Sequence, residues 1–125
     1  MWRRLIGGGR ERKGRKRPNF AGRDYIVLDE FGFRVIDPNR REAGMSWTDV
    51  RTIVGGVAPA YMYELIYLRF ESAVDWLIVD DLVEGFAPFA REVETRFGID
   101  PAWYGELLSF EGEAEMVLYP SVPIH

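Results

Sequence analysis

From residue 24 onward, the apolar residues fall in short runs that are separated by Gly, Pro and Asn, a pattern that predicts consecutive β-strands. In the longest run, Ile66, Leu68 and Phe70 alternate with Tyr67 and Arg69. This period of two predicts a strand in which Ile66, Leu68 and Phe70 face the core. The strands are expected over residues 25–28, 33–36, 52–54, 63–70, 76–79 and 116–119.

The segments between these runs predict turns. Gly32 allows a tight hairpin turn between the first two strands, because glycine adopts backbone angles that other residues avoid. A polar loop is expected over residues 40–44, and a tight turn over 46–50 that leads into the next strand. Gly55 and Gly56 are expected to bend the chain and end that strand.

Residues 85–97 have the period of an amphipathic helix rather than that of a strand. Their apolar positions recur at spacings of three, one, three and four residues, which places them on one stripe. The stripe consists of Phe86, Phe89, Ala90, Val93 and Phe97. Gly98 is expected to end the helix, and Asp81 and Glu84 are expected to place carboxylates near its positive end.

The order of these elements predicts a mixed α+β fold. Because the strands come first and one amphipathic helix comes near the C-terminus, we expect a small, strongly bent antiparallel sheet or a partly open barrel, covered by that helix. Trp47, Trp76 and Trp103 are expected in the core, since Trp supplies much buried area in a small domain. The chain has 125 residues, of which 47% are apolar, enough for one domain but not for two.

The charge of the chain divides it into two parts. Residues 1–23 hold nine of the sixteen basic residues and one acid, which gives 9 − 1 = +8, whereas residues 24–125 carry 7 − 19 = −12. We therefore expect a flexible basic tail over residues 1–23 and a single domain over residues 24–125.

A dense basic cluster in the tail is expected to bind phosphate, whether in nucleic acid or in anionic lipid. Trp2, Leu5 and Ile6 would add a small membrane anchor in the second case. The tail could also lie against the acidic domain of its own or another copy, in a salt-dependent contact, or be a solvated terminus without a specific partner. The cluster consists of Arg10, Arg12, Lys13, Arg15, Lys16 and Arg17.

The order of motifs in the acidic part resembles that of the bacterial PH-like domains. A hairpin with Gly32 at its turn is followed by Ser46-Trp47-Thr48-Asp49-Val50, then by two paired strands, and then by the helix that contains Phe86. In that family, a Trp-x-Asp-hydrophobic step leads into the next strand, and a C-terminal helix caps the barrel. The resemblance covers roughly residues 24–104 and extends to small bacterial proteins similar to immunity proteins, which are acidic and act by covering a partner.

The resemblance implies a PH-like fold and a binding role, but with one departure. Phosphoinositide-binding PH domains carry Lys and Arg between their first two strands, where this chain has Asp29, Glu30 and Phe31. Lipid binding by the domain itself is therefore not expected.

The residue types leave little room for catalysis. The only His is the terminal His125, and Cys is absent, which argues against an imidazole base, a thiol nucleophile and the common zinc sites. Neither glycine run is followed by the Lys-Ser/Thr of a phosphate loop. We expect no cofactor and no metal, and a hydrolase that uses Asp80 and Asp81 is the least favoured alternative.

Several carboxylates precede the helix, and capping or solvation explains them better than a calcium site, because the Gly-centred ligand loop of an EF-hand is absent. They are Asp75, Asp80, Asp81 and Glu84. Two other groups are candidates for binding a partner protein, through exposed aromatic and Met side chains and through negative charge. They are Tyr61, Met62 and Tyr63 in a predicted loop, and Glu111, Glu113 and Glu115 near the C-terminus.

The sequence thus predicts a non-enzymatic protein–protein interaction module, of which immunity-type and regulatory proteins are two forms. Its expected partner is another, basic protein. The alternative is a protein that associates with nucleic acid or an anionic membrane through the basic tail. Because the chain lacks Cys and a long apolar segment, we expect it in the cytoplasm.

Overall fold

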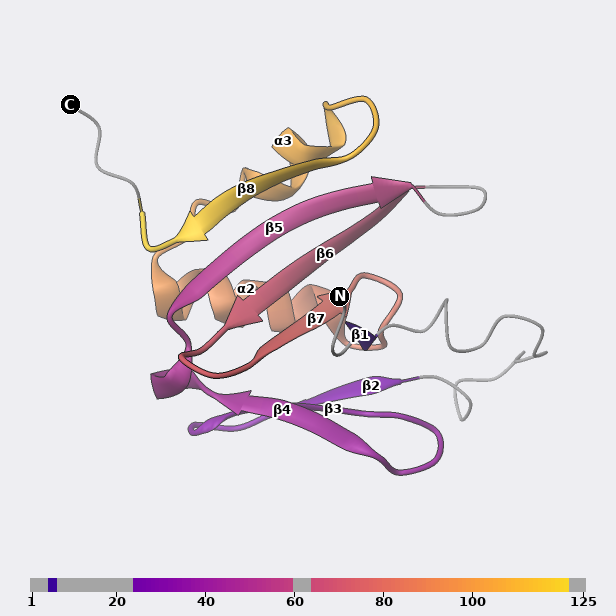
Figure 1. The fold of residues 1–125 in the computed structure, drawn as a ribbon, viewed down its shortest axis with the longest axis vertical. Coiled ribbons are helices and arrows are strands. Elements are labelled where there is room, and N and C mark those ends of the chain that lie inside the picture. Colours follow the sequence, from indigo (N-terminus) through magenta and orange to yellow (C-terminus); the bar gives the residue numbers. More distant parts are fainter. Residues whose placement is uncertain (1–4, 7–23, 60–63, 122–125) are drawn as a thin grey trace.

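A computed structural model of the chain describes residues 5–6, 24–59 and 64–121, with residues 5–6 described by their backbone alone. Their strands form two sheets, which lie one above the other in Figure 1. The larger sheet has the order β1-β7-β6-β5-β8, and the smaller has the order β2-β3-β4. All neighbouring strands are antiparallel except β1, which runs parallel to β7.

The larger sheet consists of Leu5–Ile6 (β1), Trp76–Asp80 (β7), Glu64–Glu71 (β6), Thr52–Pro59 (β5) and Ala114–Tyr119 (β8). The smaller sheet consists of Tyr25–Leu28 (β2), Gly32–Ile36 (β3) and Glu42–Ser46 (β4). The described residues also form two α-helices, Phe86–Phe97 (α2) and Trp103–Leu108 (α3). The α+β prediction is confirmed, and among the described residues no strand pairing closes the sheets into a barrel.

The core lies where the two sheets and α2 meet. Phe33 of β3, Phe70 of β6 and Phe89 of α2 are at most 2% exposed. Their ring centroids are 4.8 Å apart for Phe33 and Phe70, and 4.9 Å apart for Phe33 and Phe89. Three aromatic side chains from three layers therefore hold the sheets and the helix together, at separations typical of favourable ring pairs.

The predicted alternation of β6 is confirmed, because Ile66, Leu68 and Phe70 are buried in the core. The amphipathic helix is also confirmed. It ends at Gly98, which has a φ of 65° and whose N–H donates to the carbonyl of Glu94. Ile99, the next residue, is 7% exposed, so the helix end is fixed by an apolar contact as well.

Two Trp predictions are confirmed and one is wrong. Trp47 and Trp103 are 7% and 3% exposed and belong to the core cluster. Trp47 lies in a short 3-10 helix, Trp47–Asp49, and its indole N–H donates to the carbonyl of Asp29 at 3.0 Å. Trp76 is only half-buried and pairs with Glu71 on the face of β7 that points away from the core.

The polar loop predicted over residues 40–44 is wrong, because Glu42–Ser46 forms β4 and pairs along the whole of β3. The turn lies earlier, at Arg40, which has a φ of 69°. Gly44 sits directly opposite Arg34, and a side chain there would collide with the carbonyl of Phe33. Glycine thus permits a close approach between the strands that strand propensity alone does not indicate.

The bend predicted at Gly55 and Gly56 is also wrong. β5 runs without interruption from Thr52 to Pro59, and both glycines pair with β6 on one side and β8 on the other. A side chain at Gly56 would collide with the ring of Tyr67. The glycine therefore makes room for a cross-strand aromatic ring rather than breaking the strand.

The expectation of strands first and one helix last needs correction. A second helix, α3, follows α2, and the chain then returns to the larger sheet as β8, beside β5. Figure 1 shows α2 behind β6 and β7, and α3 close to β8. None of the described helices is long and apolar enough to cross a membrane.

Candidate functional site

A pocket of about 700 Å³ lies where β7 leads into α2 and α3 packs alongside. This volume is within the range of pockets that hold small ligands or partner side chains. Its walls come from the connection over residues 81–85, from α2 as far as Glu94 and from the start of α3. We call it the acidic pocket and define it by Asp81, Glu84, Arg91, Glu94, Trp103 and Tyr104.

The connection that forms one wall of the acidic pocket is tied to the smaller sheet. The N–H of Glu84 donates to the carbonyl of Asp24 at 3.0 Å, and the N–H of Ile26 donates to the carbonyl of Glu84 at 3.2 Å. Gly85, with a φ of 90°, then turns the chain into α2, an angle that costs glycine little. Both carboxylates of this wall, Asp81 and Glu84, are thus carried on a backbone held at several points.

Two side-chain hydrogen bonds attach α3 to the other walls. The hydroxyl of Tyr104 donates to Oδ2 of Asp81 at 3.0 Å. The indole N–H of Trp103 donates to Oε2 of Glu94 at 2.8 Å. The two neighbouring aromatic residues therefore reach in different directions, and each meets a carboxylate of the acidic pocket.

Negative charge predominates in the acidic pocket, with three carboxylates and one guanidinium. Arg91 compensates only weakly, because its nitrogen is 3.9 Å from Oε1 of Glu94 and its side chain is 71% exposed. Burial raises the pKa of Asp81, and the hydrogen bond from Tyr104 offsets only part of that effect. The Asp81 carboxylate is thus poorly solvated and would gain from a cation brought into the pocket.

The lining of the acidic pocket has the chemistry to bind a cationic group. None of the described residues that line it is Ser, Thr, His, Cys or Lys, and its ionisable side chains are three carboxylates, the guanidinium of Arg91 and the hydroxyl of Tyr104. The described part of the chain also contains no group of three or more His, Cys, Asp or Glu that could hold a metal ion. Carboxylates beside aromatic rings suit a cationic group, through charge and through cation–π attraction.

The carboxylates predicted to cluster before the helix do not all meet. Asp75 precedes β7 and Asp80 ends it, so these two lie at opposite ends of the strand. Only Asp81 and Glu84 line the acidic pocket. The predicted capping is wrong, because the N-cap of α2 is Gly85 and no side chain caps the helix; Asp80 instead accepts from the N–H of Leu82 at 3.0 Å.

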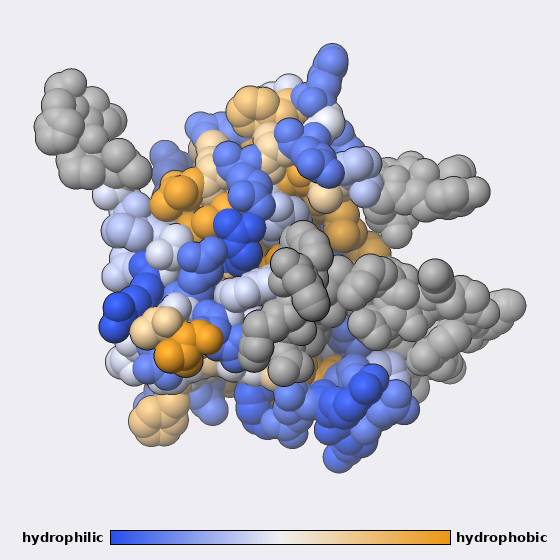
Figure 2. Space-filling model, in the orientation of Figure 1, coloured by the Kyte–Doolittle hydropathy of each residue, from blue (hydrophilic) through white to orange (hydrophobic). Residues whose placement is uncertain are grey.

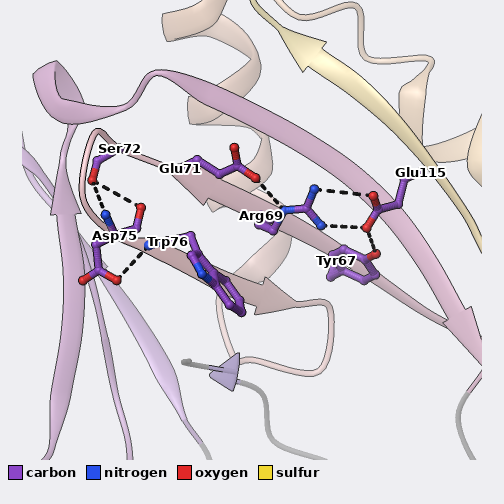
Figure 3. A network of polar contacts seen from close by, with 7 residues as sticks. All are labelled: Tyr67, Arg69, Glu71, Ser72, Asp75, Trp76 and Glu115. Carbon is purple, nitrogen blue, oxygen red and sulfur yellow. Dashed lines mark hydrogen bonds and ion pairs between the residues drawn. The ribbon is translucent and has the colours of Figure 1, made fainter. Parts of the chain in front are cut away.

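A second polar group lies on the face of the larger sheet opposite the core (Figure 3). Glu115 of β8 accepts from the hydroxyl of Tyr67 at 2.5 Å and from Arg69 at 2.7 Å, and Arg69 also contacts Glu71 at 2.9 Å. Burial raises the pKa of Glu115, but the hydrogen bonds from Arg69 and Tyr67 outweigh it and hold this pKa below its usual value. Burial and the Glu115 carboxylate both raise the pKa of Tyr67 well above its ordinary range.

The predicted acidic patch near the C-terminus is therefore not uniform. Glu115 belongs to an internal ion pair, whereas Glu111 and Glu113 are exposed in the turn between α3 and β8. A role for these residues in binding a partner stays a prediction. The predicted contact residues Tyr61, Met62 and Tyr63, and the basic cluster Arg10, Arg12, Lys13, Arg15, Lys16 and Arg17, lie outside the described residues.

One face of the described surface carries small apolar groups rather than one large patch. On the face in Figure 2, hydrophilic residues predominate and the apolar residues are scattered among them. At the acidic pocket, Leu82 and Tyr104 are each 37% exposed. A partner would thus meet charge first and a few apolar side chains second.

The sequence indicated some residues of the acidic pocket but not the pocket itself. Asp81 and Glu84 were predicted as carboxylates near the start of the helix and Trp103 as a core residue, whereas no functional role was predicted for Tyr104, Arg91 and Glu94. A usable signal was the aromatic pair Trp103-Tyr104, because two adjacent side chains on a helix cannot both face the core.

Comparison with known proteins gives no relative for this chain: no protein-family model, no curated protein and no solved structure matches it.

Proposed function

We propose that the protein is a non-enzymatic binding module that receives a basic segment of a partner protein in the acidic pocket. One observation carries the proposal: three carboxylates, with a single exposed guanidinium, line a pocket of about 700 Å³ together with three aromatic residues. A Lys or Arg side chain has the charge to neutralise this surplus, and its apolar stem suits the aromatic walls.

The charge of the whole domain supports the same partner. Residues 24–125 carry −12, so a basic protein would be drawn to the domain before it contacts the pocket. Leu82 and Tyr104, partly exposed at the pocket, would supply the apolar contact that charge alone lacks. An immunity-type or regulatory protein that covers a basic partner would act in this way.

The proposal includes a relationship to the bacterial PH-like domains. A hairpin followed by the Trp47–Asp49 turn, and an amphipathic helix packed against bent antiparallel strands, support it. The return of the chain as β8 after α2 and α3 is a departure from the order expected of that family.

The binding test uses the full chain and a fluorescent tetra-arginine peptide, with fluorescence anisotropy at low salt as the readout. The variant Asp81→Asn/Glu84→Gln removes two charges of the acidic pocket. Loss of two surface-type ion pairs, each worth up to ~1 kcal/mol, predicts about tenfold weaker binding. High salt should weaken the wild type and reduce the difference.

A matched control separates the acidic pocket from overall charge. Glu30→Gln/Asp49→Asn removes the same charge from two exposed positions outside the pocket, and every variant keeps the basic residues of the tail. The control should bind the peptide within about twofold of the wild type, since scattered surface charges act weakly. Equal weakening in both variants would show that only net charge matters and would refute the pocket as the site.

A further inference from the structure

The N-terminal strand β1 occupies the outer edge of the larger sheet. Leu5 pairs with Ile78 and Ile6 with Val79, both in parallel register. β7 pairs with β6 on its other side, so it would be the edge strand if β1 were removed. The backbone edge of β7 is therefore a place where an extended segment is seen to bind.

The pairing of β1 with this edge is short. β1 has two residues, whereas β7 has five, and a typical strand is about five or six residues long. An exposed strand edge offers a row of backbone donors and acceptors to any extended chain. A longer segment would pair with more of β7 than β1 does and could take its place.

The direction of β1 links the edge of β7 to the acidic pocket. Because the two strands are parallel, Ile6 lies beside Val79, close to the end of β7, where Asp80 is the last residue and Asp81 follows. A segment bound in the same direction would place the residues after its apolar pair near Asp81 and Glu84 of the pocket.

We propose that the edge of β7 is a strand-acceptor site, which Leu5–Ile6 of the same chain occupies and which an extended segment of a partner displaces. The partner segment has two adjacent apolar residues followed by basic ones, the chemistry of this chain's own first 23 residues, where Leu5-Ile6 precedes residues 7–23 of formal charge 7 − 1 = +6. The inference rests on the proposed function for the basic character of the partner, and it adds the binding mode, which is strand addition followed by entry of a basic side chain into the pocket.

The test uses the full chain with Leu5→Pro/Ile6→Pro. Proline has no backbone N–H and cannot donate to a sheet, so the double variant removes whichever amide of β1 faces β7. The matched control, Phe20→Pro/Ala21→Pro, introduces the same two prolines elsewhere in the N-terminal part. The probe is a synthetic peptide of residues 1–17 that carries a C-terminal fluorophore.

The double variant is expected to bind the peptide at least about tenfold more tightly than the wild type and the control. In those two chains, the tethered segment competes at an effective concentration on the order of millimolar. Exchange of backbone amide protons should agree. Successive N–H groups of a strand point to opposite neighbours, so one of the Ile78 and Val79 amides should exchange faster in the double variant while the other keeps the protection of β6.

Three outcomes would overturn the inference. The peptide could bind all three chains equally, or none of them. The wild type could sediment as a dimer that the double variant does not form, which would make the edge an interface between copies.

The inference and the proposed function fail separately. If Asp81→Asn/Glu84→Gln weakens peptide binding while the two proline variants bind the peptide equally, binding in the acidic pocket is supported and the strand-acceptor site is refuted. If the double proline variant binds more tightly and the pocket variant changes nothing, the edge of β7 is a binding site and the pocket is not.

Discussion

Gly56→Ala tests how the face shown in Figure 3 is built. Gly56 lies in β5, directly between Tyr67 of β6 and Glu115 of β8. A Cβ atom there would overlap the ring and the hydroxyl of Tyr67. Because Tyr67 is only 7% exposed and its hydroxyl donates to Glu115, the ring cannot move aside without losing both its packing and its hydrogen bond.

These contacts set the size of the effect. Overpacking of this kind costs about 1–3 kcal/mol, and a lost hydrogen bond to a charged group costs about 1.5–3 kcal/mol. If the Tyr67 ring moves, the overpacking is relieved but the hydrogen bond to Glu115 is lost, so the two costs do not add fully. We expect Gly56→Ala to lower the free energy of unfolding by about 2–4 kcal/mol, a large part of the 5–15 kcal/mol typical of a domain.

The assay is urea unfolding, followed by tryptophan fluorescence and circular dichroism. Gly56→Ala is measured in the wild type and in a Tyr67→Ala background, where the obstructing ring is gone and the cost should fall below about 1 kcal/mol. Gly105→Ala is the control, because a Cβ atom there meets nothing within 4 Å and the residue lies in α3. Alanine should leave stability unchanged or raise it by up to about 1 kcal/mol.

Two results would refute this account of Gly56. Gly56→Ala could unfold at the same urea concentration as the wild type. Its cost could also be the same with and without the Tyr67 ring, which would place the strain elsewhere.

Three further substitutions have expected outcomes. The folded-state pKa of Glu115 is lowered from 4.5, so the ionised carboxylate stabilises the fold above that value, and this stabilisation is lost as the pH falls through the lowered pKa. The stability of Glu115→Gln, measured by urea unfolding, should therefore fall less steeply in acid than that of the wild type. The pKa of Asp81 is raised, so its charge destabilises the fold at neutral pH, and this destabilisation disappears as the pH falls through the raised pKa. Asp81→Asn keeps an acceptor for the Tyr104 hydroxyl, and at neutral pH it should be as stable as the wild type or up to ~1 kcal/mol more stable. Phe89→Ala removes a side chain that is 0% exposed and should cost about 3–5 kcal/mol in thermal or urea unfolding.

The sequence predicted those elements whose local pattern agrees with their tertiary surroundings. The alternation along β6 and the stripe of α2 each specify a buried face without reference to the rest of the chain. β4 was missed because Glu42, Ala43 and Gly44 are poor strand formers, and they form a strand because β3 offers an edge that Gly44 can approach closely.

The position of β8 and the nature of the site depend on contacts between distant residues. β8 pairs with β5 across more than fifty residues of sequence, and no local pattern specifies that partner. In the same way, Asp81 and Tyr104 are 23 residues apart in the chain yet share a hydrogen bond. Their residue types were visible in the sequence, but the pocket they form was not.

The measurement that tests the central claim most directly is a titration of the full chain with tetra-arginine, observed at the indole N–H resonances of its four Trp residues. The Trp103 indole lines the acidic pocket and donates to Glu94, whereas the Trp47 indole donates to the carbonyl of Asp29 away from it. Binding in the pocket predicts a saturable shift of the Trp103 resonance with the Trp47 resonance unchanged. A Trp103 resonance that does not move while the peptide binds would contradict the claim that the acidic pocket receives the basic partner.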